Sequence, residues 1–167
     1  VSIASNNSTT TLAKVADVVT LTFTASETIA TPVVTFQSGG AAITDNSITY
    51  VNTSGNIWTA AYTTESSDTT GSVTYSIAFS DSAGNAGTAV TSGSGSVTFD
   101  KTAPTLSSVS IASNNSTTTL AKVADVVTLT FTASETIATP VVTFQSDGDA
   151  IQDNSITYVN TSGNIWT

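Results

Sequence analysis

The sequence contains no cysteine, histidine, methionine or arginine, and lysine is its only basic side chain. Three lysines stand against twelve acidic residues, which gives a net charge of −9. Without cysteine the chain can form no disulfide and can perform no thiolate chemistry. Without a basic patch it cannot displace counterions from phosphate groups. We therefore expect neither a nucleic acid nor an anionic membrane surface as a partner.

The missing side chains also argue against catalysis. Histidine, cysteine and arginine supply most general bases, thiol nucleophiles and oxyanion-stabilising groups, and all three are absent. No nucleophile-elbow or phosphate-loop motif occurs either. We therefore expect that the chain is not an enzyme.

Long apolar stretches are missing too, so we expect no membrane insertion in this segment, since a helical span needs about 18 or more apolar residues. Charged residues make up only 9% of the chain, and polarity comes from serine and threonine, which occupy 60 of 167 positions. A hydroxyl-rich, sparsely acidic surface without disulfides is typical of an extracellular protein on a bacterial cell surface. We expect that location.

The feature that is present is a repeat. Residues 109–167 repeat residues 1–59 with three differences: Gly39/Asp147, Ala41/Asp149 and Thr44/Gln152. The displacement of 108 positions matches the size of one β-sandwich domain, so each copy is long enough to own a core. The repeat therefore predicts tandem domains and not a short solenoid.

Apolar and polar residues alternate with the period of a β-strand, and no helical stripe runs for more than two turns. Residues 18–25 show the pattern well, with Val19, Leu21 and Phe23 on one face and threonines on the other. The predicted strands cover residues 1–4, 18–25, 32–37, 48–51, 57–63, 72–80 and 96–99. Seven strands with one apolar face each require two packed sheets, so we predict an all-β, seven-stranded, immunoglobulin-like β-sandwich.

This pattern divides the chain into a complete domain at residues 1–99, a short joint at 100–104 and a second copy at 105–167. The second copy would be incomplete, with only its first five strands. Pro104 restricts Ala103 to an extended conformation and so stiffens the joint. We expect consecutive domains to stack end to end with limited bending.

Three motifs resemble the tandem bacterial Ig-like repeats of giant surface adhesins. They are Phe-Asp-Lys-Thr-Ala-Pro-Thr at residues 99–105, Phe-Ser-Asp-Ser-Ala-Gly-Asn at 79–85 and Phe-Thr-Ala-Ser-Glu at 23–27. The resemblance covers the whole chain. It implies a role as spacer or filament, and it implies that Ca²⁺ between domains can stiffen the rod.

The resemblance assigns oxygen ligands for that calcium, because Ca²⁺ takes six to eight carboxylate, carbonyl and water oxygens. At the joint the predicted ligands are Asp100, Glu65, Asp68 and Glu135. Asp81 and Asn85 lie at the opposite end of the first domain and would serve a preceding joint. An alternative stays open, in which Asp81 accepts backbone N–H bonds in an Asx-type turn around Gly84.

The three differences between the copies all fall in the predicted loop after residue 37, or after 145 in the second copy. Two of them introduce an aspartate into the second copy. Asp147, Asp149 and Asp153 resemble the start of a cation loop, although the spacing is not that of an EF-hand. The alternative is a solvated loop that is free to vary between copies. Both interpretations stay open.

Taken together, these features favour a structural segment of an extracellular bacterial surface protein, acting as a stiff spacer or stalk whose partners are the neighbouring repeats. Two alternatives remain. One is a subunit of a filament, completed by strand exchange between identical chains. The other is a glycan- or ice-binding module that uses the exposed ladder Thr20, Thr22 and Thr24.

Overall fold

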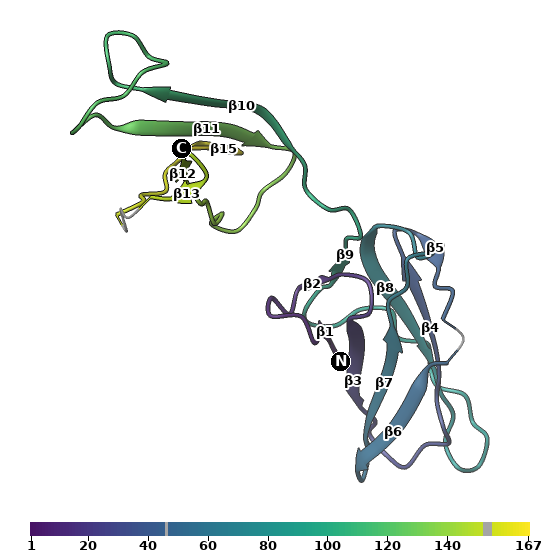
Figure 1. Ribbon diagram of the computed structural model, residues 1–167. Helices are drawn as coiled ribbons and strands as arrows, with labels where there is room; N and C mark the ends of the chain where they lie inside the picture. The colour runs from purple at the N-terminus through teal and green to yellow at the C-terminus, as the bar shows by residue number, and fades with distance from the viewer. Residues whose placement is uncertain (46, 152–154) are drawn as a thin grey trace. The chain divides into compact units, whose positions relative to one another are not determined.

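The computed structural model describes residues 1–45, 47–151 and 155–167. These residues form strands, turns and connecting coil, so the fold is all-β (Figure 1). The chain divides into two compact units, Val1–Lys101 and Thr102–Thr167, which we call unit 1 and unit 2. Within the described ranges there is no helix of the length and hydropathy needed to cross a membrane.

Unit 1 consists of two sheets. The first has the strand order β1-β3-β7-β6, with β1 at Ser2–Ser5, β3 at Val18–Thr24, β7 at Ile57–Thr63 and β6 at Thr49–Ser54. The second has the order β2-β9-β8-β4-β5, with β2 at Leu12–Ala13, β9 at Thr98–Phe99, β8 at Gly71–Ala78, β4 at Val33–Ser38 and β5 at Ala41–Ala42. The pairings are antiparallel except that of β2 with β9.

The alternating side chains of both sheets meet in a single apolar cluster. From the first sheet, Leu21 of β3 is fully buried and lies opposite Ala60 of β7. From the second sheet, Phe36 places its ring 4.8 Å from that of Tyr62, at an interplanar angle of 42°. Because the buried residues of the two sheets share one core, unit 1 has a β-sandwich-like arrangement.

Each strand that the alternation predicts in unit 1 is present; the bounds of the 57–63 strand agree, and those of the others differ by up to three residues. The pattern missed β2 and β5, because a two-residue strand carries no periodic signal. β2 pairs with β9, whereas β1 pairs with β3 of the other sheet. The first thirteen residues therefore contribute to both sheets.

Unit 2 has one sheet in the order β10-β11-β15-β14 and a separate pair, β12 and β13. Their bounds are β10 at Leu106–Ser113, β11 at Val127–Ala133, β12 at Gln145–Ser146, β13 at Asp149–Ala150, β14 at Asn160–Ser162 and β15 at Ile165–Trp166. Ile111 pairs with Leu129 in the register of Ile3 with Leu21. The repeated sequence thus repeats its local strand pairing.

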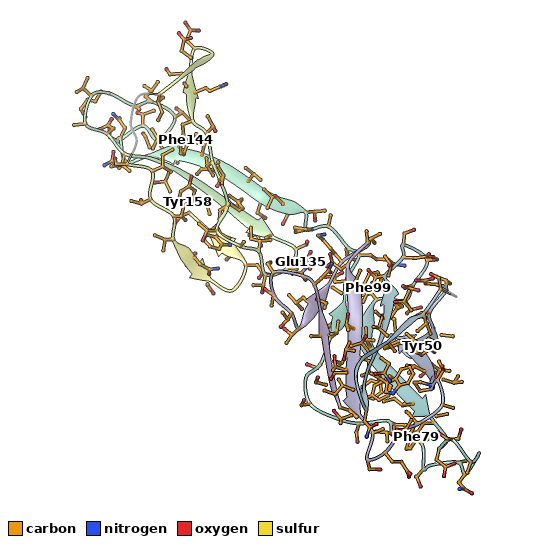
Figure 2. All side chains as sticks on the ribbon, turned by 90° about the horizontal axis from the view of Figure 1, so that it is seen from below. Tyr50, Phe79, Phe99, Glu135, Phe144 and Tyr158 are labelled. Atoms are coloured by element: carbon orange, nitrogen blue, oxygen red, sulfur yellow. The ribbon has the colours of Figure 1, made fainter. Side chains whose placement is uncertain are left out.

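A tyrosine contact is also common to both units; Figure 2 labels the two tyrosines, Tyr50 and Tyr158. The backbone N–H of Val34 donates to the Tyr50 hydroxyl over 2.9 Å, and that of Val142 donates to Tyr158 over 3.0 Å. The strands around this contact differ, however. β4 pairs with β8 over six residues in unit 1, whereas in unit 2 the matching segment is a strand only at β12. The prediction of a full strand at residues 141–146, the counterpart of β4, is therefore wrong. No described strand of unit 2 takes the place of β8 as its partner.

With only its first five strands, the second copy is predicted to leave Phe131, Phe144 and Trp166 with half of their cover, and this is wrong for Phe131 and Trp166. They remain 4% and 8% exposed, because they lie opposite each other on adjacent strands and shelter one another. The aliphatic side chains lose their cover instead. Ile111 is 62% exposed, whereas its counterpart Ile3 is 5% exposed.

Candidate functional site

The loops at one end of unit 1 are joined by hydrogen bonds. The 14–17 turn meets the segment after β7, where Ala16 N–H donates to the carbonyl of Thr64 over 2.9 Å and Thr64 N–H donates to that of Asp17 over 2.9 Å. The segment after β5 meets the 64–70 connection through Thr44 and Asp68. These bonds make the end of the unit an ordered loop cluster.

Asp68 lies at the centre of this cluster and is 1% exposed. Its Oδ1 accepts from the backbone N–H and the hydroxyl of Thr44 over 3.0 and 3.1 Å. Its Oδ2 accepts from the backbone N–H of Glu65 over 2.9 Å. The buried carboxylate therefore accepts from backbone donors of two loops, which is the usual way in which a buried charge is stabilised.

Lys101 ties the end of unit 1 to the same loop. Its Nζ donates to the backbone carbonyls of Ser66 and Asp68 over 2.9 and 2.8 Å. The neighbouring backbone N–H of Asp100 donates to the carbonyl of Ala13 over 2.8 Å. The last residues of unit 1 are therefore anchored to the 64–70 connection and to β2, and do not leave the unit as a free tail.

The structure places the predicted calcium ligands of the joint in different settings. Glu65 accepts from the hydroxyls of Thr44 and Ser67, and the Asp68 carboxylate binds backbone donors. Glu135 follows β11 in unit 2. Within residues 1–45, 47–151 and 155–167, no three acidic side chains are grouped so that they could hold a metal ion. The arrangement in unit 1 fits a hydrogen-bond network better than a preformed cation site.

The Asp81 loop after β8 has the geometry of an Asx-type turn. Asp81 Oδ1 accepts from the N–H groups of Ala83 and Asn85 over 2.9 and 2.8 Å, and its Oδ2 accepts from Asn85 Nδ2 over 2.7 Å. Gly84 adopts a φ of 91°, which favours glycine. The bond from the Asn85 side chain, together with those from backbone N–H groups, lowers the pKa of Asp81. Both carboxylate oxygens are thus used within the turn.

The unit 2 hairpin carries two acids, Asp147 in the turn between β12 and β13 and Asp149 on β13. Asp147 and Gly148 form its two-residue turn with φ values of 52° and 86°, which matches Gly39 and Gly40 at 57° and 82°. Asp149 lies on β13 and is exposed. The third predicted ligand, Asp153, lies outside the described residues.

Sequence reasoning missed the Asn–Lys–Asp group that orders the turn before β3. Asp17 accepts from Asn7 Nδ2 over 2.7 Å, from Lys14 N–H over 2.9 Å and from Lys14 Nζ over 3.2 Å. Asn115, Lys122 and Asp125 make the same bonds in unit 2. The repeat gives no signal for this group, because all but three of the 59 repeated positions are unchanged between the two copies.

This group gives a prediction for the effect of pH. Burial raises the pKa of Asp17, but the bonds from Asn7 and Lys14 outweigh it and hold that pKa below its usual value of 3.8. A lowered folded-state pKa stabilises the fold above the unfolded value and loses that contribution as pH falls through the folded value. We expect the melting temperature of unit 1 to fall from about pH 5 towards pH 2, and Asp17→Asn to flatten this fall. Thermal melts across that range measure it, and an unchanged slope in the variant would contradict it.

Comparison of the chain with protein-family models, curated proteins and solved structures found no match.

Proposed function

We propose that this chain is a segment of tandem immunoglobulin-like repeats that acts as a stiff spacer or stalk of an extracellular bacterial surface protein. The observation that carries the proposal is the repeat itself. Fifty-nine positions recur with three differences, all in or beside a single hairpin. The strands and the polar turns are the same in both copies. What the copies share is therefore a domain-sized building block, as in other repeat proteins.

The strand order of unit 1 supports the immunoglobulin-like part of the proposal. One sheet runs β1-β3-β7-β6 and the other runs β2-β9-β8-β4-β5, so the first segment of the chain divides between the two sheets. Without the two-residue strands β2 and β5, the seven strands in chain order are β1, β3, β4, β6, β7, β8 and β9. The first, second, fifth and fourth of these form one sheet, and the third, sixth and seventh belong to the other. Immunoglobulin-type sandwiches divide their seven strands in the same way.

Stiffness is supported by the way in which unit 1 ends. Lys101 is bound to two backbone carbonyls of the 64–70 connection, and three residues later Pro104 limits the backbone. The joint therefore has few freely rotating residues. Arrays of increasing repeat number, imaged by atomic force microscopy, test the proposal. We expect their contour length to grow linearly and their bending to remain small, and compact or freely coiling arrays would contradict it.

Calcium stiffening is the part of the proposal that chelation tests. Glu65, Asp100 and Glu135 would supply carboxylates to an ion at the joint, together with backbone oxygens and water. Since extracellular calcium modules bind with dissociation constants of about 0.1–1 mM, we expect about 5 mM Ca²⁺ to raise the melting temperature of a multi-repeat array and EDTA to reverse the rise. Magnesium at the same concentration is the control. Identical melts in calcium and EDTA would eliminate calcium from the proposal.

The filament alternative rests on a different observation, the exposed apolar face of unit 2. Ile111 and Val127 are 62% and 42% exposed, and edge or face contacts of this kind are sites of strand exchange. Light scattering over a wide range of concentrations separates the two functions. A filament subunit assembles as concentration rises, whereas a spacer remains a single chain.

A further inference from the structure

The first and last segments of unit 1 lie side by side and run in the same direction, because β2 pairs with β9 in parallel (Figure 1). Thr98 N–H donates to the carbonyl of Thr11 over 2.9 Å, and Asp100 N–H donates to that of Ala13 over 2.8 Å. The segment by which the chain enters the unit is therefore bonded directly to the segment by which it leaves.

The chain enters and leaves unit 1 at opposite ends of the sandwich. β3 runs along the length of the unit, and Ser2 pairs with Thr22 close to one end of that strand. Lys101 binds the carbonyls of Ser66 and Asp68 in the loop cluster, which lies at the other end of β3. Tension applied to the two ends of the unit therefore acts along the strands and not across them.

Tension in this direction loads the pairing of β2 with β9 in shear. β2 is drawn towards the end where the chain enters, and β9 is drawn towards the end where it leaves. The hydrogen bonds between the strands lie across the pull, so they share the load and must break together. The same bonds would open one after another if the strands were peeled apart from one end.

β1 adds a second link between the entering and leaving segments. It pairs with β3 on one side, and on the other side Ile3 N–H donates to the carbonyl of Ser94 over 3.1 Å. Ser94 N–H in turn donates to the carbonyl of Val1 over 2.9 Å. A Cβ atom at Gly95 would overlap the carbonyl oxygen of Ile3, so a glycine there permits this close approach. The two segments are thus tied together at two places along the unit.

Side chains hold the same segments against sliding. Ile3, Ala13, Val97 and Phe99 are at most 5% exposed and belong to the core, so a displaced segment would draw apolar side chains into water. Lys101 adds a contact beyond the end of β9, because its ammonium group is bonded to two backbone carbonyls. Load that arrives at the end of β9 is therefore passed to the 64–70 connection as well.

We propose that segments 1–13 and 94–101 form a mechanical clamp through which unit 1 bears tension, and that Lys101 is the latch that passes part of the load to the 64–70 connection. A stalk is loaded along its length, so the inference rests on the proposed function. The clamp is a property of one unit, however, and it can fail while an array is still long and stiff.

The first test stretches the full chain by its two ends at constant force, in EDTA so that no bound ion contributes. Unit 1 is recognised by its released length, about 1.5 times that of unit 2. Lys101→Met is expected to shorten the lifetime of unit 1 about tenfold, because it removes two bonds from a charged donor. Lys14→Met is the matched control, since Lys14 Nζ binds Asp17 within its own turn, and its lifetime should stay within about twofold of the native chain. Equal lifetimes in the two variants would overturn the proposal.

The second test changes the direction of the pull. The chain has no cysteine, so introduced cysteines can carry the handles. The pair Val1→Cys and Ala103→Cys loads the clamp along its strands, whereas Lys14→Cys and Ala103→Cys pull at the ends of β2 and β9 that lie on the same side. The second pair is expected to unfold unit 1 at about half the force or less, because the bonds then open singly.

The first pair in a Lys14→Met background is the control, because it lacks the same lysine. Equal forces in the two directions would overturn the proposal, since a unit without a clamp has no preferred direction of resistance. This result leaves the spacer test intact, because that test measures the length and bending of arrays and not the force that one unit withstands.

Discussion

Replacing Ile3 by alanine is expected to destabilise unit 1 by about 2–4 kcal/mol, whereas the same replacement at Ile111 should change the stability of unit 2 by about 0.5 kcal/mol or less. The two isoleucines share their flanking sequence and their strand register. They differ in cover, since Ile3 is 5% and Ile111 is 62% exposed. The comparison therefore measures what the second sheet contributes to the core.

The physical reason is that a truncated side chain costs its transfer free energy and leaves a cavity only where neighbours surround it. Ile3 belongs to the core of unit 1, in which residues of β8 and β9 complete the packing. Ile111 lines a large open cavity of unit 2, so replacing it with alanine removes little buried apolar surface. Phe23 and Phe131 supply a control pair, because they are 6% and 4% exposed and alanine should be costly at both, about 3–5 kcal/mol.

The two tryptophans allow each unit to be followed separately. Trp58 belongs to unit 1 and Trp166 to unit 2, and the chain has no other tryptophan. Urea unfolding in a Trp166→Phe background reports unit 1, and unfolding in a Trp58→Phe background reports unit 2. Equal losses at Ile3 and Ile111 would mean that the face of unit 2 is as well covered in solution as that of unit 1.

The strands were predictable because their chemistry is local. In β3 the residues Val19, Leu21 and Phe23 alternate with threonines, and this alone fixes both the strand and its buried face. β2 is set by a partner distant in sequence, as in the pairing of Leu12 with Thr98, and β5 is a two-residue partner of β4 in a hairpin, so neither shows an alternation of its own. The alternation of apolar and polar residues therefore predicts only strands that are long enough to show it.

The loop cluster could be predicted in outline only. Alternating strand directions place the 14–17, 43–45 and 64–70 segments at the same end, and their hydrogen bonds confirm this. The sequence also identifies Glu65 and Asp68 as acids of this end. It cannot tell that Asp68 turns inward to Thr44, 24 positions earlier, because that choice depends on which backbone donors packing leaves unsatisfied.

The hairpin substitution shows the same limit. Gly39/Asp147 reads in the sequence as variation in an exposed loop. In unit 1, however, a Cβ atom at Gly39 would overlap the carbonyl oxygen of Thr70, 31 positions later, which passes over the turn. No periodicity or motif encodes a close backbone approach, so a glycine that is required by packing looks like any turn glycine.

Replacing Asp68 by alanine is expected to destabilise unit 1 by about 2–5 kcal/mol. The carboxylate accepts three hydrogen bonds, two from Thr44 and one from Glu65. Alanine leaves the N–H groups of Thr44 and Glu65 without this acceptor, and each lost hydrogen bond to a charged group costs about 1.5–3 kcal/mol. The loss should be seen as a lower urea midpoint in the Trp166→Phe background.

Asp68→Asn separates this account from a simple loss of packing. Asparagine keeps the size and one acceptor oxygen, so it can serve Thr44 but turns its amide donor towards the N–H of Glu65. We therefore expect a loss between those of the native chain and alanine, about 1–2 kcal/mol. Ser67→Ala is the surface control, because it removes the exposed hydroxyl contacts with Thr44 and Glu65, at 2.7 and 3.4 Å, and leaves Asp68 in place, so it should cost about 0.5 kcal/mol or less. If asparagine were as costly as alanine, the charge of Asp68 would matter more than its hydrogen bonds, and a cation close to this loop would regain support.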